Sequence, residues 1–205
     1  MYRMPRFAAA FLIALAVSVA LSALSVSAAS REGEKRPSQW ASPVAVAGAP
    51  NLHRVVQDVY RSAQPTPRGF KNLEELGVKT VVNLRAFHGD QRALTGTSLR
   101  ELRVKMYAWD PEEEEIIQVM RILADLDGGP YLVHCMDGAD RTGVVIAVYR
   151  MVFQDWTREA AVDEMVNGGF GLHLIWGDIL RYLKQVDVEK IRRLAGLSDN
   201  RTYDL

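Results

Sequence analysis

The chain has 205 residues, 25 Lys and Arg against 25 Asp and Glu, and 48% hydrophobic residues. This size and composition predict one globular domain with a short appendage, and they exclude a disordered chain or a polytopic membrane protein. A formal net charge of zero offers no basic surface to DNA or RNA, so we expect no nucleic-acid partner. With Cys135 as the single cysteine, an intramolecular disulfide and a cysteine-based zinc cluster are also excluded.

An apolar leader opens the chain. Arg3 and Arg6 precede an uncharged run over residues 7–26, which small residues follow. This pattern predicts a secretory signal peptide over residues 1–28, cleaved after Ala28. The run is also long enough to cross a bilayer core of about 30 Å, so an uncleaved membrane anchor is the alternative. In either case we expect an exported domain that is periplasmic, secreted or held at the inner membrane.

A period-free stretch follows the leader. Residues 29–50 are rich in small residues and proline, which predicts a linker and places the folded domain at 51–205. Two short runs with β propensity, 52–56 and 59–62, predict a hairpin.

The next elements are a capped helix and a strand. Thr66 followed by Pro67 is a helix-start signal, and Gly77 is a stop, so we expect a helix over 67–76. The apolar run 79–84 then predicts a buried strand.

A polar stretch leads to three further elements. We expect a short helix over 98–102 and a strand over 104–109. Asp110 and Pro111 repeat the cap-and-proline signal, and the apolar residues that follow predict a helix over 111–126.

The second half of the chain is mostly helical around one central strand. Residues 131–134 form a short apolar run, and residues 142–153 are apolar on nearly every side, as in a buried helix. Thr157 caps a helix that we expect to reach Val166, and one or two amphipathic helices should follow between 174 and 194. The fold class predicted is α/β, with a small, mostly parallel sheet flanked by helices on both faces.

The loop between that strand and the apolar helix reads HCMDGADRTG, from His134 to Gly143. A tight loop at a helix N-terminus directs several backbone N–H groups at one point, where the helix dipole also attracts an anion. The same field favours the thiolate form of Cys135. The planar fork of Arg141 suits two phosphate oxygens, and Gly138 permits close approach of the backbone.

These groups together indicate one reaction. The Cys135 thiolate attacks phosphorus while Arg141 and the loop amides hold the phosphate oxygens, and a phosphocysteine forms and is hydrolysed. We expect the Thr142 hydroxyl to hydrogen-bond the sulfur and ease its departure. The chemistry needs no metal and no other cofactor.

The spacing Cys-x5-Arg, followed by Thr-Gly and preceded by His, resembles the signature of cysteine-dependent protein-tyrosine and dual-specificity phosphatases. Residues 59–65 (VYRSAQP) and 73–84 (LEELGVKTVVNL) are similar to the entry elements of compact dual-specificity domains, especially bacterial atypical members. The resemblance covers about residues 52–190 and implies a dual-specificity phosphatase-like fold.

The resemblance also implies residue roles. Cys135 is then the nucleophile, Arg141 the phosphate clamp, His134 the residue that orients the loop and Thr142 the hydroxyl that aids breakdown of the phosphoenzyme. The phosphate-binding loop comprises Met136, Asp137, Gly138, Ala139, Asp140 and Arg141.

The general acid has two candidates. Asp110 resembles the acid that the family supplies from an upstream loop, although an aspartate before proline is also a helix cap. Asp140 resembles the aspartate inside the loop of myotubularin-type lipid phosphatases, although it could instead pair with a basic side chain at the rim. The sequence leaves both open.

The substrate is equally open. Phosphotyrosine or phosphoserine/threonine in proteins is one class, and an inositol phosphate or phosphoinositide is the other. A rhodanese-like sulfurtransferase also places a cysteine in an anion-binding loop, but the Arg-Thr-Gly entry into the helix disfavours it. A pseudophosphatase would not need both Cys135 and Arg141. The remaining histidines, His53, His88 and His173, are scattered singly and predict surface or satisfied core positions.

Overall fold

The computed structural model describes residues 36–107, 110–173 and 177–197. The leader predicted at 1–28 lies outside these ranges. Within them, no helix combines the length and hydropathy needed to cross a membrane. One compact unit begins at Ser38 and contains every element described below.

The core of this unit is a six-stranded sheet in the order β1-β2-β3-β6-β4-β5. Strands β3, β6, β4 and β5 run parallel, whereas β1 and β2 add an antiparallel edge. The strands are β1 (Ser42–Pro43), β2 (His53–Val56), β3 (Val59–Ser62), β4 (Thr80–Arg85), β5 (Arg100–Met106) and β6 (Tyr131–His134). The predicted mostly parallel sheet and the predicted β2–β3 hairpin are both confirmed.

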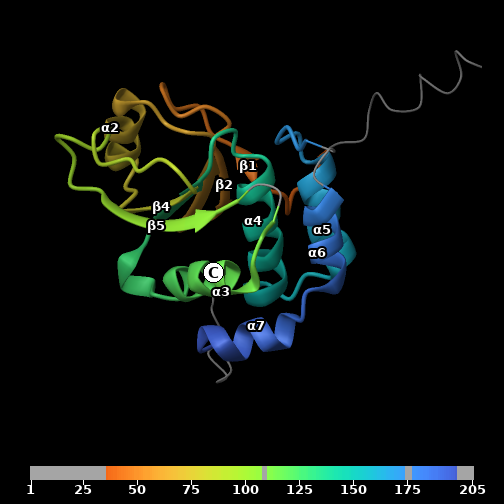
Figure 1. Cartoon of the computed structure of the whole chain (residues 1–205). Coiled ribbons are helices and arrows are strands. Elements are labelled where there is room, and N and C mark those ends of the chain that lie inside the picture. Colours follow the sequence, from red (N-terminus) through yellow and green to blue (C-terminus); the bar gives the residue numbers. More distant parts are fainter. Residues whose placement is uncertain (1–35, 108–109, 174–176, 198–205) are drawn as a thin grey trace, which may run out of the picture. The chain divides into compact units, whose positions relative to one another are not determined.

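Helices cover both faces of the sheet, as predicted (Figure 1). Val81 and Leu132 face a cluster with helix α2, while their neighbours Val82 and Val133 face the larger cluster of α3 and α4. This alternation follows from the two-residue period of a strand. The helices are α2 (Pro67–Glu75), α3 (Glu113–Leu123), the 3-10 turn η1 (Leu126–Gly128), α4 (Asp140–Phe153), α5 (Arg158–Asn167), α6 (Gly177–Gln185) and α7 (Val188–Ala195).

Local capping signals identified two helices correctly. Thr66 caps α2 by accepting a hydrogen bond from Gly69 N at 3.1 Å, and Thr157 caps α5 through Ala160 N at 3.2 Å. Helix α4 is buried over almost its whole length, and it begins at Asp140, two residues earlier than predicted. The first turn of α4 therefore belongs to the catalytic loop predicted from sequence.

The short helix predicted at 98–102 is wrong. Strand β5 starts at Arg100 and pairs in parallel with β4, with Thr80 opposite Arg100 and Val82 opposite Leu102. Pairing with a buried neighbouring strand outweighs the local helix preference of these residues. The predicted strand 104–109 overlaps the end of β5, and residues 108–109 lie outside the described ranges.

The predicted start of the helix after Asp110 is also wrong. Helix α3 begins at Glu113 with Glu112 as its N-cap, and the Glu115 side chain accepts from Glu112 N at 3.2 Å. A run of four glutamates contains its own reciprocal cap, so the helix does not need the aspartate. Asp110 is exposed, and Pro111 beside it is buried. The side chain of Asp110 is thus not the N-cap of α3.

The second half of the predicted linker is part of the fold. Ala41 is fully buried, and its backbone N–H donates to Glu164 Oε1 at 2.6 Å. Glu164 in turn pairs with Arg150 at 2.7 Å, both side chains being 2% exposed or less. Residues 42–43 form β1 against β2. This segment lacks a hydrophobic period because single contacts with distant residues hold it, and a local pattern does not record them.

Candidate active site

The catalytic loop lies at the carboxyl edge of the parallel strands. Cys135 directly follows β6, a fully buried strand between β3 and β4, and Arg141 lies in the first turn of α4. Clefts at this edge are where open α/β sheets bind ligands. The N-terminus of α4 adds its dipole and free N–H groups to the same point.

Four successive carbonyl groups of the loop are each bound by a donor, in three cases from outside the loop. The pairs are Cys135 O with His134 Nδ1 at 3.1 Å, Met136 O with Gln64 N at 3.0 Å, Asp137 O with Asn51 Nδ2 at 3.0 Å, and Gly138 O with Arg61 Nη2 at 2.8 Å.

These bonds set the direction of the amide groups. In a planar trans peptide the C=O and the next N–H point in opposite directions. Holding the four carbonyls toward these donors therefore turns the N–H groups of residues 136–139 away from the donors. A loop held in this way can present several N–H groups to an anion, and the contacts that hold it do not require the anion.

Gly138 is required by the shape of this loop. Its φ is +70°, and a Cβ placed there would lie 2.5 Å from both Ser62 O and Ala63 N. Because both neighbours are backbone atoms, a side chain could be accommodated only if β3 or the loop moved. The glycine lets the loop lie directly on the end of β3.

Two residues of this arrangement were missed by sequence reasoning. Arg61 is 1% exposed on β3 and stacks over the Phe170 ring at 3.6 Å while it donates to Gly138 O. Asn51, at φ 54°, also donates to Phe170 O at 2.9 Å and so joins the loop to the segment after α5. The sequence did contain one sign of this role, since Arg61 is a charged residue inside a short run with β propensity.

We expect Arg61→Met to lower kcat/KM for an aryl phosphate by about 10- to 100-fold, because a charge-assisted hydrogen bond is worth about 1.5–3 kcal/mol. Methionine keeps apolar contact with Phe170 but leaves the Gly138 carbonyl without its donor. Steady-state kinetics measure the effect.

Arg158→Met is the matched control for this change. The Arg158 guanidinium likewise donates to backbone carbonyls, those of Leu183 and Val186, but at the opposite end of α4. Its loss should lower the melting temperature and leave kcat/KM close to wild type. Equal losses of kcat/KM in both variants would contradict a specific role for Arg61.

Cys135 and Arg141 were predicted as the nucleophile and the anion clamp. Cys135 is 2% exposed at the base of the loop. Within the described residues, the buried Nε of Arg141 and the Thr142 hydroxyl have no hydrogen-bond partner. The expected bond from Thr142 to the sulfur is therefore not made in this structure. Buried polar atoms without partners are rare in folded proteins, and a bound phosphate would satisfy the guanidinium.

His134 lies beneath the loop with both ring nitrogens engaged. Nδ1 contacts Cys135 O, and Nε2 lies 2.7 Å from Asp90 Oδ2. The sequence predicted an orienting role for His134, and its contact with the Cys135 carbonyl is consistent with that. It did not indicate Asp90, which comes from the polar segment between β4 and β5.

A model of the tyrosine phosphatase family matches residues 49–170 of the chain. The chain belongs to the tyrosine phosphatase family. It is accordingly a phosphoric monoester hydrolase of the tyrosine/dual-specificity type, which confirms the resemblance drawn from the loop signature. This result favours the phosphatase over the sulfurtransferase alternative.

Named relatives agree with this assignment. The dual specificity protein phosphatase TpbA of Pseudomonas aeruginosa is 37% identical over 159 residues, which cover 77% of this chain and 71% of the relative. Its crystal structure matches with a TM-score of 0.71 at 34% identity and covers 80% of this chain and 100% of that chain. Another crystal structure, of a TpbA variant in complex with pTyr, also has a TM-score of 0.71. An inositol diphosphatase, DSP5 of Arabidopsis thaliana, is 26% identical and covers 70% of this chain and 73% of the relative.

In this phosphatase the carboxylate of Asp140 is already engaged. Asp140 Oδ1 accepts from His173 N at 2.9 Å, and Asp140 Oδ2 lies 2.8 Å from His173 Nδ1. The hydrogen bond that His173 makes to the Asp140 carboxylate, together with the charge of that carboxylate, raises the pKa of His173 above its ordinary value. Asp140 is thus paired with a basic side chain at the rim, one of the two arrangements left open by the sequence.

Asp110 lies elsewhere on the same edge. It follows β5, which is two strands from β6 and therefore about 10 Å away across the sheet. It is exposed, and the buried Pro111 anchors the chain immediately after it. Asp140 therefore lies in the first turn of α4, paired with His173, whereas Asp110 lies outside the loop and is exposed.

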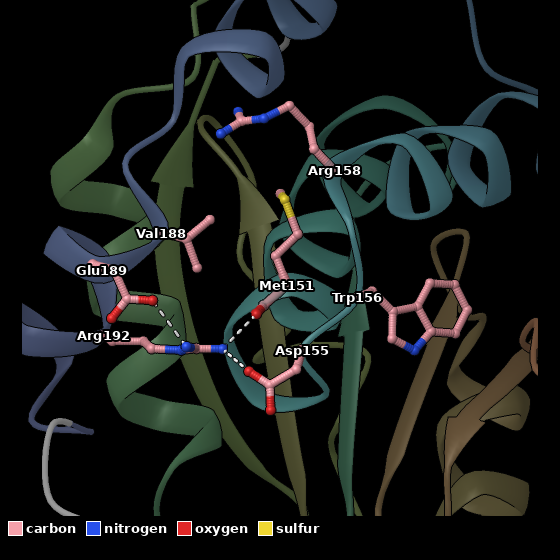
Figure 2. A pocket seen from close by; sticks show the side chains of 7 residues that line it. All are labelled: Met151, Asp155, Trp156, Arg158, Val188, Glu189 and Arg192. Atoms are coloured by element: carbon pink, nitrogen blue, oxygen red, sulfur yellow. Dashed lines mark hydrogen bonds and ion pairs between the residues drawn. The ribbon is translucent and has the colours of Figure 1, made fainter.

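A pocket of about 260 Å³ lies far from the phosphatase loop (Figure 2). It borders the C-terminal end of α4, and this helix of 14 residues is ~21 Å long at 1.5 Å per residue. Arg192 of α7 donates there to Met151 O at 2.8 Å and to Val152 O at 3.0 Å, and it also contacts Asp155 and Glu189. The last carbonyls of a helix need such partners, so we assign this pocket to the packing of α7 on α4.

Proposed function

We propose that this phosphatase hydrolyses phosphotyrosine in proteins through a phosphocysteine on Cys135. The observation that carries the proposal is the set of four loop carbonyls held outward, which leaves a cradle of amide N–H groups above the thiol. Such donors stabilise the charge that develops on phosphate oxygens in the transition state. Arg141 completes the cradle with its planar fork.

The reaction proceeds in two displacements. The Cys135 thiolate forms an S–P bond as the P–O bond to the substrate breaks, and the leaving oxygen takes a proton from a general acid. Water then attacks phosphorus, the S–P bond breaks, and inorganic phosphate leaves with the thiolate regenerated.

We assign the acid role to Asp110. A general acid must hold a proton and reach the leaving oxygen at the mouth of the cradle. Both Asp140 oxygens instead accept hydrogen bonds from His173, so the carboxylate is already engaged by another residue. Asp110 is exposed and free of the helix cap, so it can approach a bound substrate from the rim.

The charge and shape of the rim favour an aryl phosphate over a densely phosphorylated inositol. The loop carries Asp137 and Asp140 and no lysine, so additional phosphates would meet like charge. Met136 is 51% exposed beside the nucleophile and offers an apolar contact to a tyrosine ring. The complex of the TpbA variant with pTyr supports the same class, whereas DSP5 supports the inositol class at lower identity.

A comparison of substrates tests this proposal. In EDTA, we expect the purified protein to hydrolyse phosphotyrosine peptides with kcat/KM at least about tenfold above that for phosphoserine peptides and a diphosphoinositol phosphate, a difference of ~1.4 kcal/mol. Phosphate release measures all three. Faster hydrolysis of the diphosphoinositol compound would overturn the substrate assignment, and turnover that requires a divalent metal would overturn the mechanism.

A further inference from the structure

A buried contact between a histidine and an aspartate lies directly beside the catalytic loop. His134 Nε2 and Asp90 Oδ2 are 2.7 Å apart, and their side chains are 0% and 1% exposed. His134 belongs to the end of β6, whereas Asp90 belongs to the segment between β4 and β5. The reaction as proposed above does not use Asp90.

The partners of the imidazole determine its protons. Nδ1 contacts the Cys135 carbonyl oxygen at 3.1 Å, and a carbonyl can only accept. Nε2 contacts a carboxylate, which also accepts when it is ionised. Only the imidazolium form donates from both nitrogens, so an ionised Asp90 requires a positively charged His134.

Other contacts keep Asp90 in place and ionised. Asp90 Oδ1 accepts from Gln64 Nε2 at 2.8 Å, and Asp90 N donates to Glu101 Oε1 at 2.8 Å. Burial by itself would raise the pKa of Asp90, but hydrogen bonds from His134 and Gln64 and the charges of His134 and Arg85 hold it below its ordinary value.

We propose that Asp90 is a positioning residue that holds His134 as an imidazolium under the catalytic loop and thereby favours the thiolate of Cys135. The inference deepens the function proposed above and rests on Cys135 as its nucleophile. His134 Nδ1 contacts the Cys135 backbone carbonyl, whereas Asp90 contacts Nε2 at the other side of the ring. We therefore expect the positive charge of the ring to act on the thiolate more strongly than the negative charge of Asp90.

Several other charges act on this region. Arg85 and Glu101 flank Asp90, and Phe70 contributes only an apolar ring edge to His134. Around the loop are Arg61, Arg141, Asp137 and the Asp140–His173 pair. A change confined to Asp90 leaves all of these groups in place, so its effect reports on the buried pair.

Asp90→Asn tests the proposal with little change of shape. The asparagine amide can donate to Nε2 of a neutral imidazole, whose Nδ1–H still donates to Cys135 O. Its Oδ1 can still accept from Gln64. The variant can therefore keep the hydrogen bonds of residue 90 and His134, while the negative charge of Asp90 and the positive charge of His134 are both lost. We expect the midpoint of the pH curve for Cys135 alkylation by iodoacetamide to rise by about half to one pH unit.

The sign of the shift separates the alternatives. If His134 were neutral beside an ionised Asp90, removing the negative charge would lower the midpoint, and if both were neutral the midpoint would not move. Either result overturns the proposal. Glu101→Gln is the matched control, because it removes a carboxylate from the same network without touching His134. We expect its midpoint not to rise, and a rise equal to that of Asp90→Asn would also overturn the proposal.

A second measurement needs no variant. In ¹⁵N NMR of the wild-type protein, we expect both nitrogens of His134 to carry protons at neutral pH, and a neutral tautomer would contradict the proposal. Alkylation and NMR require no substrate. A failure here is therefore distinguishable from a failure of the phosphotyrosine assignment.

Discussion

Cys135→Ser is expected to reduce hydrolysis of an aryl phosphate to background, a loss of at least about 10⁴-fold in kcat, since removing the nucleophile of a covalent mechanism has an effect of that order. Serine is close in size to cysteine, but a hydroxyl is far less acidic than a thiol and is a weaker nucleophile. The cradle of N–H groups does not depend on the sulfur, because its carbonyls are bound by residues such as Asn51 and Arg61.

Binding of inorganic phosphate distinguishes loss of the nucleophile from loss of the fold. We expect the Cys135→Ser protein to bind phosphate within about threefold of wild type by calorimetry, because the difference in interaction is well below 1 kcal/mol. Turnover that survives the substitution would exclude a phosphocysteine. Loss of both turnover and phosphate binding would instead indicate that the sulfur shapes the cradle.

Asp110→Asn is expected to lower kcat/KM for a phosphotyrosine peptide by about 10²- to 10³-fold, within the range for loss of a general acid. An amide cannot give up the proton that a tyrosine oxygen needs. An aryl phosphate with a strongly acidic phenol needs no such proton, so there the loss should be less than about tenfold. A series of leaving groups measured at one pH tests this.

Asp140→Asn provides the comparison within the same loop. Its amide can still accept from His173 N, so we expect a loss of less than about tenfold that does not depend on the leaving group. The reverse pattern, with a leaving-group dependence in Asp140→Asn and not in Asp110→Asn, would assign the acid to the loop. If the loss depended equally on the leaving group in both variants, a mechanism with one general acid would be excluded.

Local patterns predicted most elements correctly. Thr66 with Pro67 and Thr157 marked the starts of α2 and α5, because a cap involves residues only three positions apart. The prediction failed at β5, where pairing with β4 decides the conformation, and at residues 41–43, which a buried hydrogen bond and β2 hold in the fold. In both cases the deciding contact lies far along the chain.

The catalytic loop also combines features that a local pattern predicts with features that depend on distant contacts. By itself, the sequence predicted a nucleophile, a phosphate clamp and the strand–loop–helix context, because all of them lie in ten consecutive residues from His134 to Gly143. The identity of the acid stayed open in the sequence, since Asp110 and Asp140 both had local features in their favour. The pairing of Asp140 with His173 became visible only in the structure.

Only the tertiary structure decided what holds the loop in its working shape. Asn51, Arg61 and Asp90 contact loop residues that are 86, 77 and 44 positions away, respectively. None of the three has a fixed spacing to the loop, so no motif links it to the loop in the sequence. Folding brings β3, the loop at Asn51 and the segment after β4 to one edge of the sheet. Their donors and charges act there on a loop whose own residues define the reaction.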